Sequence, residues 1–505
     1  MLVLITLLLA SLVSLWLWLK FHFSYWQRRD VPHNEPQIPA GNMHEWMRTK
    51  HFAQIFRETY EKFKGTGPYA GFYFHMQKAV LVMDPELAKN ILIKDFSTFD
   101  RRGLFHNAKD DPLTANLFSL DGPKWKMLRA KLSPTFTSGK MRFMYPTVVK
   151  VGEQLGKLFE ELLKQPPHSQ VMEITDILGR FTADVIGECA FGLDCNSLKD
   201  PSAEFCVMGR KFFTQRRHGS IVDGLIHAFP EIAQKLGMRV IHQEVHEFYM
   251  GIVQQTIAYR ESHNVKRSDF MDMLIELKNQ VDADGRENFT MEELTAQAFV
   301  FFVAGFDTSS TTMSYALYEL AQQPEVQEKL RQEIEKVLEK HQQQFTYECM
   351  KDMKYLEQVI SETLRKYPVA PALFRKSTAH YQTSDPKYSI QKGTMIIIPS
   401  ECFHHDSEYF PQPEKFDPER FSTDHVASIK PCTYLPFGEG PRNCIGMRFG
   451  RMQASIGLVQ LLRKFRFSVC KETKIPVDFV IPSFNLNPLG GITLNFSKES
   501  KKVLC

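Results

Sequence analysis

The sequence lacks the cysteine patterns of disulfide-rich and zinc-binding proteins. Its nine cysteines are odd in number, and no two of them have the spacing Cys-x-x-Cys. A chain of 505 residues with such scattered thiols is not a small disulfide scaffold, and it has no paired ligands for a zinc finger. These absences indicate a reducing compartment, in which most of the thiols are inert.

Excess charge of one sign, internal repeats and low-complexity linkers are also missing. The formal net charge is only +4 for 58.5 kDa, so bulk electrostatics give no support for nucleic-acid binding. A hydrophobic fraction of 43% is enough to bury a large core. One large domain is therefore favoured over several smaller ones.

One long uncharged run stands at the amino terminus. Leu2 to Leu19 contains 18 residues without a charged side chain, near the lower limit for a helix that crosses a bilayer. Trp16, Trp18 and Trp26 are placed as interfacial aromatics would be. Basic residues follow the run and none precedes it, which places the carboxyl side in the cytosol: Lys20, Arg28 and Arg29. A cleaved signal peptide is the alternative, but its basic segment and small-residue cleavage site are not evident.

The sequence thus predicts three parts. Residues 1–20 form a membrane anchor, residues 21–42 a basic and proline-rich hinge, and residues 43–505 a single large domain. The prolines of the hinge make it a semi-rigid spacer that holds the domain at a set distance from the membrane.

Helical patterns dominate the middle of the chain, between residues 140 and 366. Lys392-Gly393 predicts a hairpin turn within one of the strand-like runs. These runs lie near the two ends of the domain, at residues 69–74, 79–83 and 388–399. The predicted fold class is mainly α, with a smaller β portion built from distant segments.

The longest predicted helix begins after Thr290, which can form a capping box with Glu293, and ends at Pro324. Apolar residues occupy nearly all of its faces, so it should be buried. A second membrane span is the alternative, but Asp307 and a cluster of hydroxyl side chains interrupt the apolar run. Such groups in the middle of a helix cost helix propensity and indicate a functional role.

One cysteine stands apart from the others. Cys444 lies in "FGEGPRNCIG", a loop of glycines and a proline immediately before a segment that predicts a helix. A thiolate is a strong iron ligand, and the pKa of a thiol falls at a helix amino terminus and beside cations such as Arg442 and Arg448. For a lone cysteine near a turn, a structural role is the more common one.

This loop resembles, at each defining position, the haem-binding loop of the cytochrome P-450 monooxygenases: Phe437, Gly440, Arg442, Cys444 and Gly446. Further motifs of the family follow in the expected order along nearly the whole chain: "WKMLR" at 125–129, "AGFDT" at 304–308, "ETLR" at 362–365 and "PERF" at 418–421. The segments "SPTFTSGKM" and "VPHNEP" resemble insect members of the microsomal, detoxifying type. The resemblance implies a single cytochrome P-450-type catalytic domain, mainly α with a smaller β portion.

The resemblance implies a set of residues around a haem b. Cys444 would be the axial ligand of the haem iron through its thiolate, which favours cleavage of the O–O bond, and Phe437 would shield the sulfur. The positions that match the family's partners of the haem carboxylates are Trp125, Arg129, Arg375 and Arg442. Arg101 is added to this set, although an ordinary surface or ion-pair role stays open for it.

Glu362 and Arg365 have two interpretations. Spaced i, i+3 on a helix, on the face opposite its apolar residues, they predict a surface salt bridge worth about 0.2–0.5 kcal/mol. The resemblance instead implies a buried network with Arg420 that locks the haem loop, in which loss of one partner costs about 3–5 kcal/mol. We follow the resemblance.

Asp307 and Thr308 lie in the middle of the longest predicted helix. The resemblance implies that this acid–alcohol pair is catalytic and delivers protons during oxygen activation. A threonine bonded back to its own helix would explain Thr308 alone. That alternative explains Asp307 poorly, because a buried carboxylate without a partner is costly.

The resemblance further implies an NADPH- and O2-dependent monooxygenase of lipophilic substrates, such as plant toxins or insecticides. It would be anchored in the endoplasmic reticulum membrane with its catalytic domain in the cytosol. The chain has no nucleotide-binding glycine loop, so electrons would come from NADPH–cytochrome P-450 reductase, with cytochrome b5 as a second candidate donor. Endogenous hormones or fatty acids are the alternative substrates. A non-catalytic haem-thiolate sensor and a peroxide-rearranging enzyme are alternatives that the Asp307–Thr308 pair disfavours.

We expect substrate to contact five segments of the domain: 104–120, 205–229, 301–308, 369–374 and 483–489. Phenylalanines within these segments predict an apolar, aromatic pocket: Phe105, Phe118, Phe212, Phe213, Phe301 and Phe302. They do not name a ligand.

Overall fold

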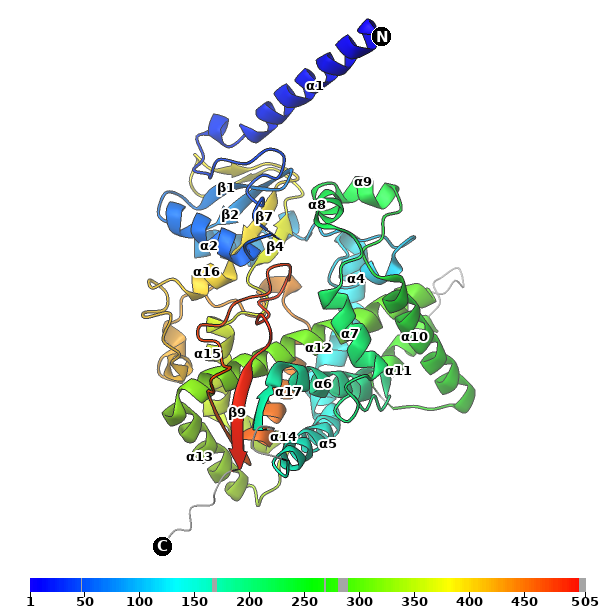
Figure 1. Cartoon of the computed structure of the whole chain (residues 1–505), viewed down its shortest axis with the longest axis vertical. Coiled ribbons are helices and arrows are strands. Elements are labelled where there is room, and N and C mark those ends of the chain that lie inside the picture. The colour runs from blue at the N-terminus through cyan, green and yellow to red at the C-terminus, as the bar shows by residue number, and fades with distance from the viewer. Residues whose placement is uncertain (47, 166–169, 268, 280–288, 499–505) are drawn as a thin grey trace.

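The computed structural model describes residues 1–46, 48–165, 170–267, 269–279 and 289–498. It confirms a mainly helical fold with small sheets. The first helix, α1 (Leu2–Phe23), extends away from the rest of the molecule (Figure 1). Within the described residues it is the one helix long and apolar enough to cross a membrane, and its apolar window is 0% buried.

Helices form the larger part of the folded body. In chain order they are α2 (Phe52–Phe63), α3 (Pro85–Lys89), α4 (Gly122–Leu132), α5 (Ser138–Leu162), α6 (Ile174–Ile186), α7 (Glu204–Thr214), α8 (Ser220–Ala228), α9 (Pro230–Lys235), α10 (Gln243–His263), α11 (Phe270–Lys278), α12 (Met291–Gln322), α13 (Pro324–Lys340), α14 (Tyr347–Asp352), α15 (Lys354–Lys366), α16 (Ser400–His404) and α17 (Met447–Leu462).

Small sheets bring distant segments of the chain together. The largest has the strand order β1-β2-β7-β4, in which β2 and β7 run parallel and the other neighbours antiparallel. A second sheet has the order β3-β9-β8, and β5 pairs with β6. The strands are β1 (Tyr69–Phe74), β2 (Gln77–Val82), β3 (Val171–Glu173), β4 (Leu373–Lys376), β5 (Tyr381–Gln382), β6 (Ser389–Ile390), β7 (Met395–Ile398), β8 (Phe465–Ser468) and β9 (Thr493–Lys498).

The hairpin predicted at Lys392-Gly393 is wrong. β6 before this turn pairs with β5, whereas β7 after it pairs with β2 and β4, so the two strands belong to different sheets. Gly393 has a φ of +85°, a conformation that favours glycine. The local pattern marks the turn correctly, but it does not say which strands pair across it.

The helix α12 passes through the centre of the helical body and packs against α6, α15 and α17 (Figure 1). Its predicted capping box is present, because Thr290 and Glu293 each accept a hydrogen bond from the backbone N–H of the other. Most of its residues are buried. The prediction of a buried helix is therefore confirmed, and the alternative of a second membrane span is wrong.

Trp26 is not an interfacial residue. Its side chain is fully buried, and its indole N–H donates to the carbonyl of Phe72 in β1 at 3.0 Å. Phe23 and Val31 belong to the same buried cluster. This part of the predicted hinge therefore packs against the sheet, a tertiary contact for which the aromatic pattern near an apolar run gives no signal. The boundaries of the three predicted parts remain predictions.

Candidate haem site

The cysteine loop, residues 437–446, leads directly into α17, which confirms the helix predicted after the cysteine. The backbone N–H of Cys444 donates to the carbonyl of Phe437 at 2.8 Å and closes the loop. Gly440 has a φ of +72°, and a Cβ at this position would lie 1.9 Å from the carbonyl oxygen of Leu92. The close approach of the two backbones therefore requires glycine here.

The Cys444 side chain is exposed, yet protein atoms surround it closely enough that burial raises the pKa of its thiol. The backbone N–H of Gly446 and the guanidinium groups of Arg129 and Arg102 oppose this rise. The sequence named a different pair of cations, whose side chains point to other partners although they are close in the chain: Arg442 and Arg448. The expected lowering of the thiol pKa is therefore wrong for the protein alone.

Arg129 of α4 and Arg442 of the loop bind these two elements to each other. The Arg129 guanidinium donates to the backbone carbonyl and the side-chain oxygen of Asn443, at 2.7 and 2.8 Å. Arg442 donates to two backbone carbonyls and lies 3.0 Å from the Asp121 carboxylate. Its guanidinium also lies over the ring of Trp125, 4.0 Å from the ring centre.

Arg102 and Arg375 complete an arginine cluster with Arg129 and Arg442. Arg102 donates to the carbonyl of Arg442 at 3.2 Å, and burial and the neighbouring guanidinium groups lower its pKa. Burial, reinforced by Arg442, lowers the pKa of Arg375 to about 9. Among the described residues, no hydrogen-bond acceptor meets Nε of Arg375 or Nη1 of Arg442.

The arginine cluster fits an anionic cofactor. Buried cations that repel one another and keep unpaired N–H groups are costly unless an anion lies among them. The two carboxylates of a haem supply such an anion, and the exposed thiol of Cys444 supplies an iron ligand beside it. The residues present therefore fit haem b.

Arg101 lies outside the arginine cluster. Its side chain is exposed beside a surface pocket that Lys376 and Glu231 also line. Its backbone carbonyl accepts the N–H of Lys376 at 2.7 Å. Because successive side chains of an extended segment point to opposite sides, the adjacent Arg102 takes the inward position that was expected for Arg101.

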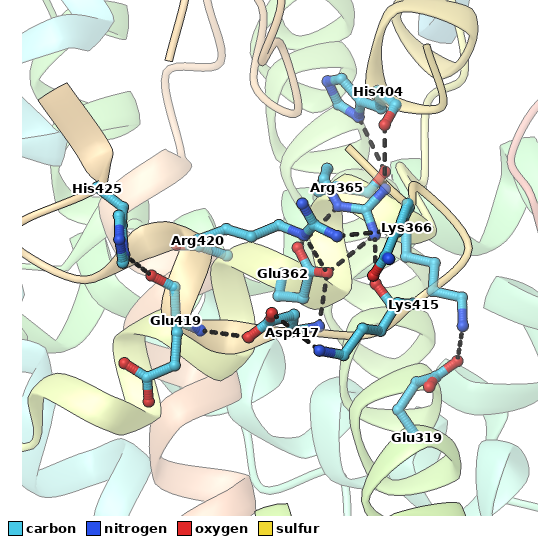
Figure 2. A network of polar contacts seen from close by, with 12 residues as sticks. Glu319, Glu362, Arg365, Lys366, His404, Lys415, Asp417, Glu419, Arg420 and His425 are labelled. Carbon is cyan, nitrogen blue, oxygen red and sulfur yellow. Dashed lines mark hydrogen bonds and ion pairs between the residues drawn. The ribbon is translucent and has the colours of Figure 1, made fainter. Parts of the chain in front are cut away.

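Glu362, Arg365 and Arg420 meet in a buried ion network (Figure 2). Arg365 donates from Nε and Nη2 to the two carboxylate oxygens of Glu362, at 2.7 and 2.9 Å, and Nε of Arg420 lies 3.4 Å away. The Glu362 and Arg365 side chains are 0% exposed. A surface salt bridge, the interpretation from helical spacing alone, is therefore wrong, because other elements cover the polar face of α15.

His404 connects this network to the chain just before the cysteine loop. Arg365 donates to the His404 carbonyl at 3.0 Å, and Nδ1 of His404 lies 3.1 Å from the Arg365 carbonyl (Figure 2). Leu435 donates its N–H to Nε2 of His404 at 2.7 Å. Since Nε2 accepts, Nδ1 carries the proton. Burial lowers the pKa of this histidine to about 3, so the ring is neutral and serves as a hydrogen-bonding connector.

Asp307 and Thr308 are neighbours on α12 with different partners. Thr308 donates to the carbonyl of Ala304 at 2.6 Å, and Ala304 is exposed although most residues of α12 are buried. The Asp307 carboxylate accepts hydrogen bonds from the side-chain amides of Asn485 and Asn487, at 2.7 and 3.2 Å. Burial raises the pKa of Asp307, and these two amides oppose the rise. The hydrogen-bond donors to Asp307 therefore come from a distant loop.

Three of the six phenylalanines that the sequence assigned to a pocket have different kinds of contact. Phe301 packs between α11 and α17, and Phe302 is fully buried against Phe205 of α7. Both join helices to one another. Phe118, in contrast, meets Phe484 edge-on with 6.2 Å between ring centres, and this contact joins two of the segments expected to touch substrate.

Comparison with known proteins assigns this arrangement to a class. The model of the family described as cytochrome P-450 matches residues 32–493, and the chain therefore belongs to the cytochrome P-450 family. It is a haem-thiolate monooxygenase, an oxidoreductase whose family receives electrons from NADPH through a reductase.

Insect proteins are among its relatives. Probable cytochrome P-450 6a20 of Drosophila melanogaster is 51% identical over 99% of this chain and 100% of its own length. Probable cytochrome P-450 6a23 of the same species is 51% identical over 98% of this chain and 99% of its own length. Cytochrome P-450 6a2 is 50% identical over 99% and 100%. These relatives confirm the likeness to insect members of the family.

Several residues of this region were not predicted from the sequence. No local signal distinguishes Arg102 from Arg101, and the doublet His404-His405 resembles a weak metal motif. Asn485 and Asn487 carry no sequence signal, because an asparagine in a loop usually satisfies its own turn. Only the tertiary fold shows what these side chains bind.

Proposed function

We propose that this monooxygenase oxidises lipophilic xenobiotics such as plant toxins or insecticides at the surface of the endoplasmic reticulum. The relatives in insects support this substrate class, and so does the aromatic contact of Phe118 with Phe484. The single observation that carries the reaction type is the exposed Cys444 thiol beside the guanidinium groups of Arg129 and Arg102, which belong to the arginine cluster. Electrons reach the site from NADPH–cytochrome P-450 reductase, and cytochrome b5 is a second donor.

In this proposal the thiolate of Cys444 would bind the haem iron, and the arginine cluster would bind the haem carboxylates. Trp125 supports Arg442 through its ring, and Phe437 covers the sulfur. The Glu362–Arg365–Arg420 network holds the cysteine loop through His404. The bound haem supplies the iron at which oxygen is activated.

Thr308 and Asp307 deliver protons in this proposal. Insertion of one oxygen atom into substrate, with release of the other as water, consumes two protons. The Thr308 hydroxyl lies on the part of α12 where Ala304 is exposed. It can give up its bond to the helix and orient a water molecule there. Asp307 is adjacent, and its raised pKa suits a group that exchanges protons.

Residues 1–20 anchor the protein in the membrane, with Lys20, Arg28 and Arg29 on the cytosolic side. The helix α1 is unburied along its apolar window and leaves the catalytic domain at one end (Figure 1). The domain then lies in the cytosol, where the reductase can reach it.

The substrate class is tested with full-length protein in membranes that also contain the reductase. A panel of plant toxins and insecticides is compared with steroid hormones and fatty acids, and NADPH-dependent oxygenated product is measured. We expect product from the xenobiotics. Product from hormones or fatty acids alone would overturn the proposed substrate class.

The ligand assignment is tested by Cys444→Ser. We expect this variant to lose the red-shifted Soret band of the ferrous carbon monoxide complex, because a serine hydroxyl does not replace a thiolate. Cys470→Ser is the matched control, since that thiol lies near Thr473 and Thr493, far from the loop in sequence and bonded to other partners. A normal thiolate band in Cys444→Ser would refute the assignment.

A further inference from the structure

The loop 483–489, which we call the C-terminal loop, rests on α12 through its central residues. The Tyr315 hydroxyl donates to the carbonyl of Leu486 at 2.8 Å. The Thr311 hydroxyl donates to the side-chain oxygen of Asn487 at 3.2 Å. These two contacts hold the loop at successive turns of the helix.

Asp307 lies one turn before Thr311 and two turns before Tyr315, so the three side chains share one face of α12. Its carboxylate accepts from Nδ2 of Asn485 at 2.7 Å and from Nδ2 of Asn487 at 3.2 Å. The side-chain amide of Asn487 thus makes two bonds to α12, as donor to Asp307 and as acceptor from Thr311. Within the described chain, no cation pairs with the Asp307 carboxylate. The two amides are therefore the groups that stabilise its negative charge.

The same loop also faces the segments that are expected to contact substrate. The Phe484 ring lies 6.2 Å from that of Phe118 and 6.0 Å from that of Phe374. Its side chain is 41% exposed, whereas Leu486 is 2% exposed and donates its N–H to the Val369 carbonyl at 2.9 Å. Phe484 is therefore the accessible end of a loop whose next residues are fixed to α12.

We propose that Asn485 and Asn487 are positioning residues for Asp307, and that they tie proton delivery on α12 to the position of the C-terminal loop against substrate. Phe484 and Asn485 are consecutive in the chain, so a substrate that displaces the ring also displaces the amide that holds the carboxylate. A well-fitting substrate leaves both amides in place. This inference rests on the proposed proton-delivering role of Asp307.

The first test replaces each asparagine in the full-length protein, reconstituted with the reductase. In Asn485→Ala and Asn487→Ala we expect the ratio of product to NADPH consumed to fall about tenfold, since a hydrogen bond to a charged group is lost. Hydrogen peroxide should rise in proportion, and the carbon monoxide spectrum should remain. Asn495→Ala is the matched control, because that amide donates to Ser468 on the neighbouring strand of the β3-β9-β8 sheet, away from Asp307. An unchanged ratio in both loop variants would overturn the inference.

A second test exchanges the two groups. In Asp307→Asn with Asn485→Asp, an amide at position 307 can donate to a carboxylate at position 485, so the loop keeps its contact. We expect the substrate KM of the double variant to be closer to the wild-type value than that of either single variant, Asp307→Asn or Asn485→Asp. The ratio of product to NADPH should stay low, because the carboxylate has left α12. Recovery of both quantities would show that the contact is only structural.

Failure of the proposed function has a separate signature. A wild-type enzyme that oxidises no compound of the panel would count against the substrate class without involving the variants. Hydrogen exchange then tests, without any catalytic turnover, whether Asp307 holds the C-terminal loop. Asp307→Ala should speed exchange of the backbone amides in this loop and leave exchange in β9 unchanged. Equal exchange of the loop in the two proteins would overturn the inference.

Discussion

Glu362 and Asp307 are carboxylates with opposite surroundings. Glu362 on α15 accepts from Arg365 and lies 3.4 Å from Arg420, so two guanidinium groups neutralise it. Asp307 on α12 accepts from two side-chain amides. Burial raises the pKa of both carboxyl groups, but only for Glu362 do positive charges oppose it.

The difference separates a structural carboxylate from one that can change its charge. An acid fixed between guanidinium groups is stabilised in its charged form by those cations, and its removal leaves buried cations without a partner. For an acid held by neutral amides, the free-energy difference between the protonated and ionised forms is smaller. Amides stabilise the negative charge less than cations do. The α15 site is therefore suited to hold the fold, and the α12 site to move protons.

The largest effect is expected for Glu362→Ala. We expect the variant to lose about 3–5 kcal/mol of stability, because the buried Arg365 loses its counter-ion. Since His404 links this network to the cysteine loop, haem binding should fail with it. Thermal unfolding and the amplitude of the carbon monoxide spectrum measure the two effects.

The matched control is Glu357→Ala on the same helix. Glu357 pairs with Arg451, but its side chain is 53% exposed, so we expect a change within about 0.5 kcal/mol. A Glu362→Ala protein as stable as the control would mean that Glu362 has no larger structural role than an exposed carboxylate, which would contradict the distinction from Asp307.

The second prediction concerns catalysis without loss of fold. Thr308→Ala removes the hydroxyl beside Asp307, and a positioned proton-delivering group is worth about 10²–10⁴ in rate. We expect NADPH consumption to continue while its electrons appear as hydrogen peroxide and less as product. An oxygen-atom donor that needs no protonation should restore part of the yield. The carbon monoxide spectrum should stay normal.

Thr295→Ala serves as the control for this variant. Thr295 is a buried threonine of α12 that donates to the carbonyl of Met291, as Thr308 does to that of Ala304. Its loss should leave the ratio of product to NADPH unchanged. Equal ratios in the two variants would mean that Thr308 is only a helix residue and that protons arrive by another route.

The sequence predicted the parts of this molecule that depend on neighbours in the chain. The capping box of α12 and the start of α17 after Cys444 follow from local rules, and the structure has both. The burial of Glu362 does not follow from its helix, because the covering elements come from elsewhere. Family resemblance supplied that network where periodicity gave a surface pair.

Other parts depend on contacts that no local pattern encodes. Arg101 and Arg102 are identical in type, and only the direction of the backbone decides which one joins the arginine cluster. Asn485 lies 178 positions from its partner Asp307. Trp26 looks like a membrane-interface residue until the sheet that covers it is known.

The arginine cluster differs from both the Glu362 and the Asp307 sites. Its buried groups are cations, and their proposed counter-ion is the cofactor. Arg375→Leu therefore has an expected effect of opposite sign in the two forms of the protein. The apoprotein should unfold no more easily than the wild type, because a desolvated cation with an unpaired Nε is removed. The holoprotein should lose haem about tenfold faster, since a hydrogen bond to a carboxylate is lost.

Haem transfer to an excess of an acceptor protein measures this rate. Arg101→Leu, which alters an exposed side chain, should leave both the stability of the apoprotein and the rate of haem loss unchanged. Faster haem loss in Arg101→Leu than in Arg375→Leu would return Arg101 to the site and remove Arg375 from it.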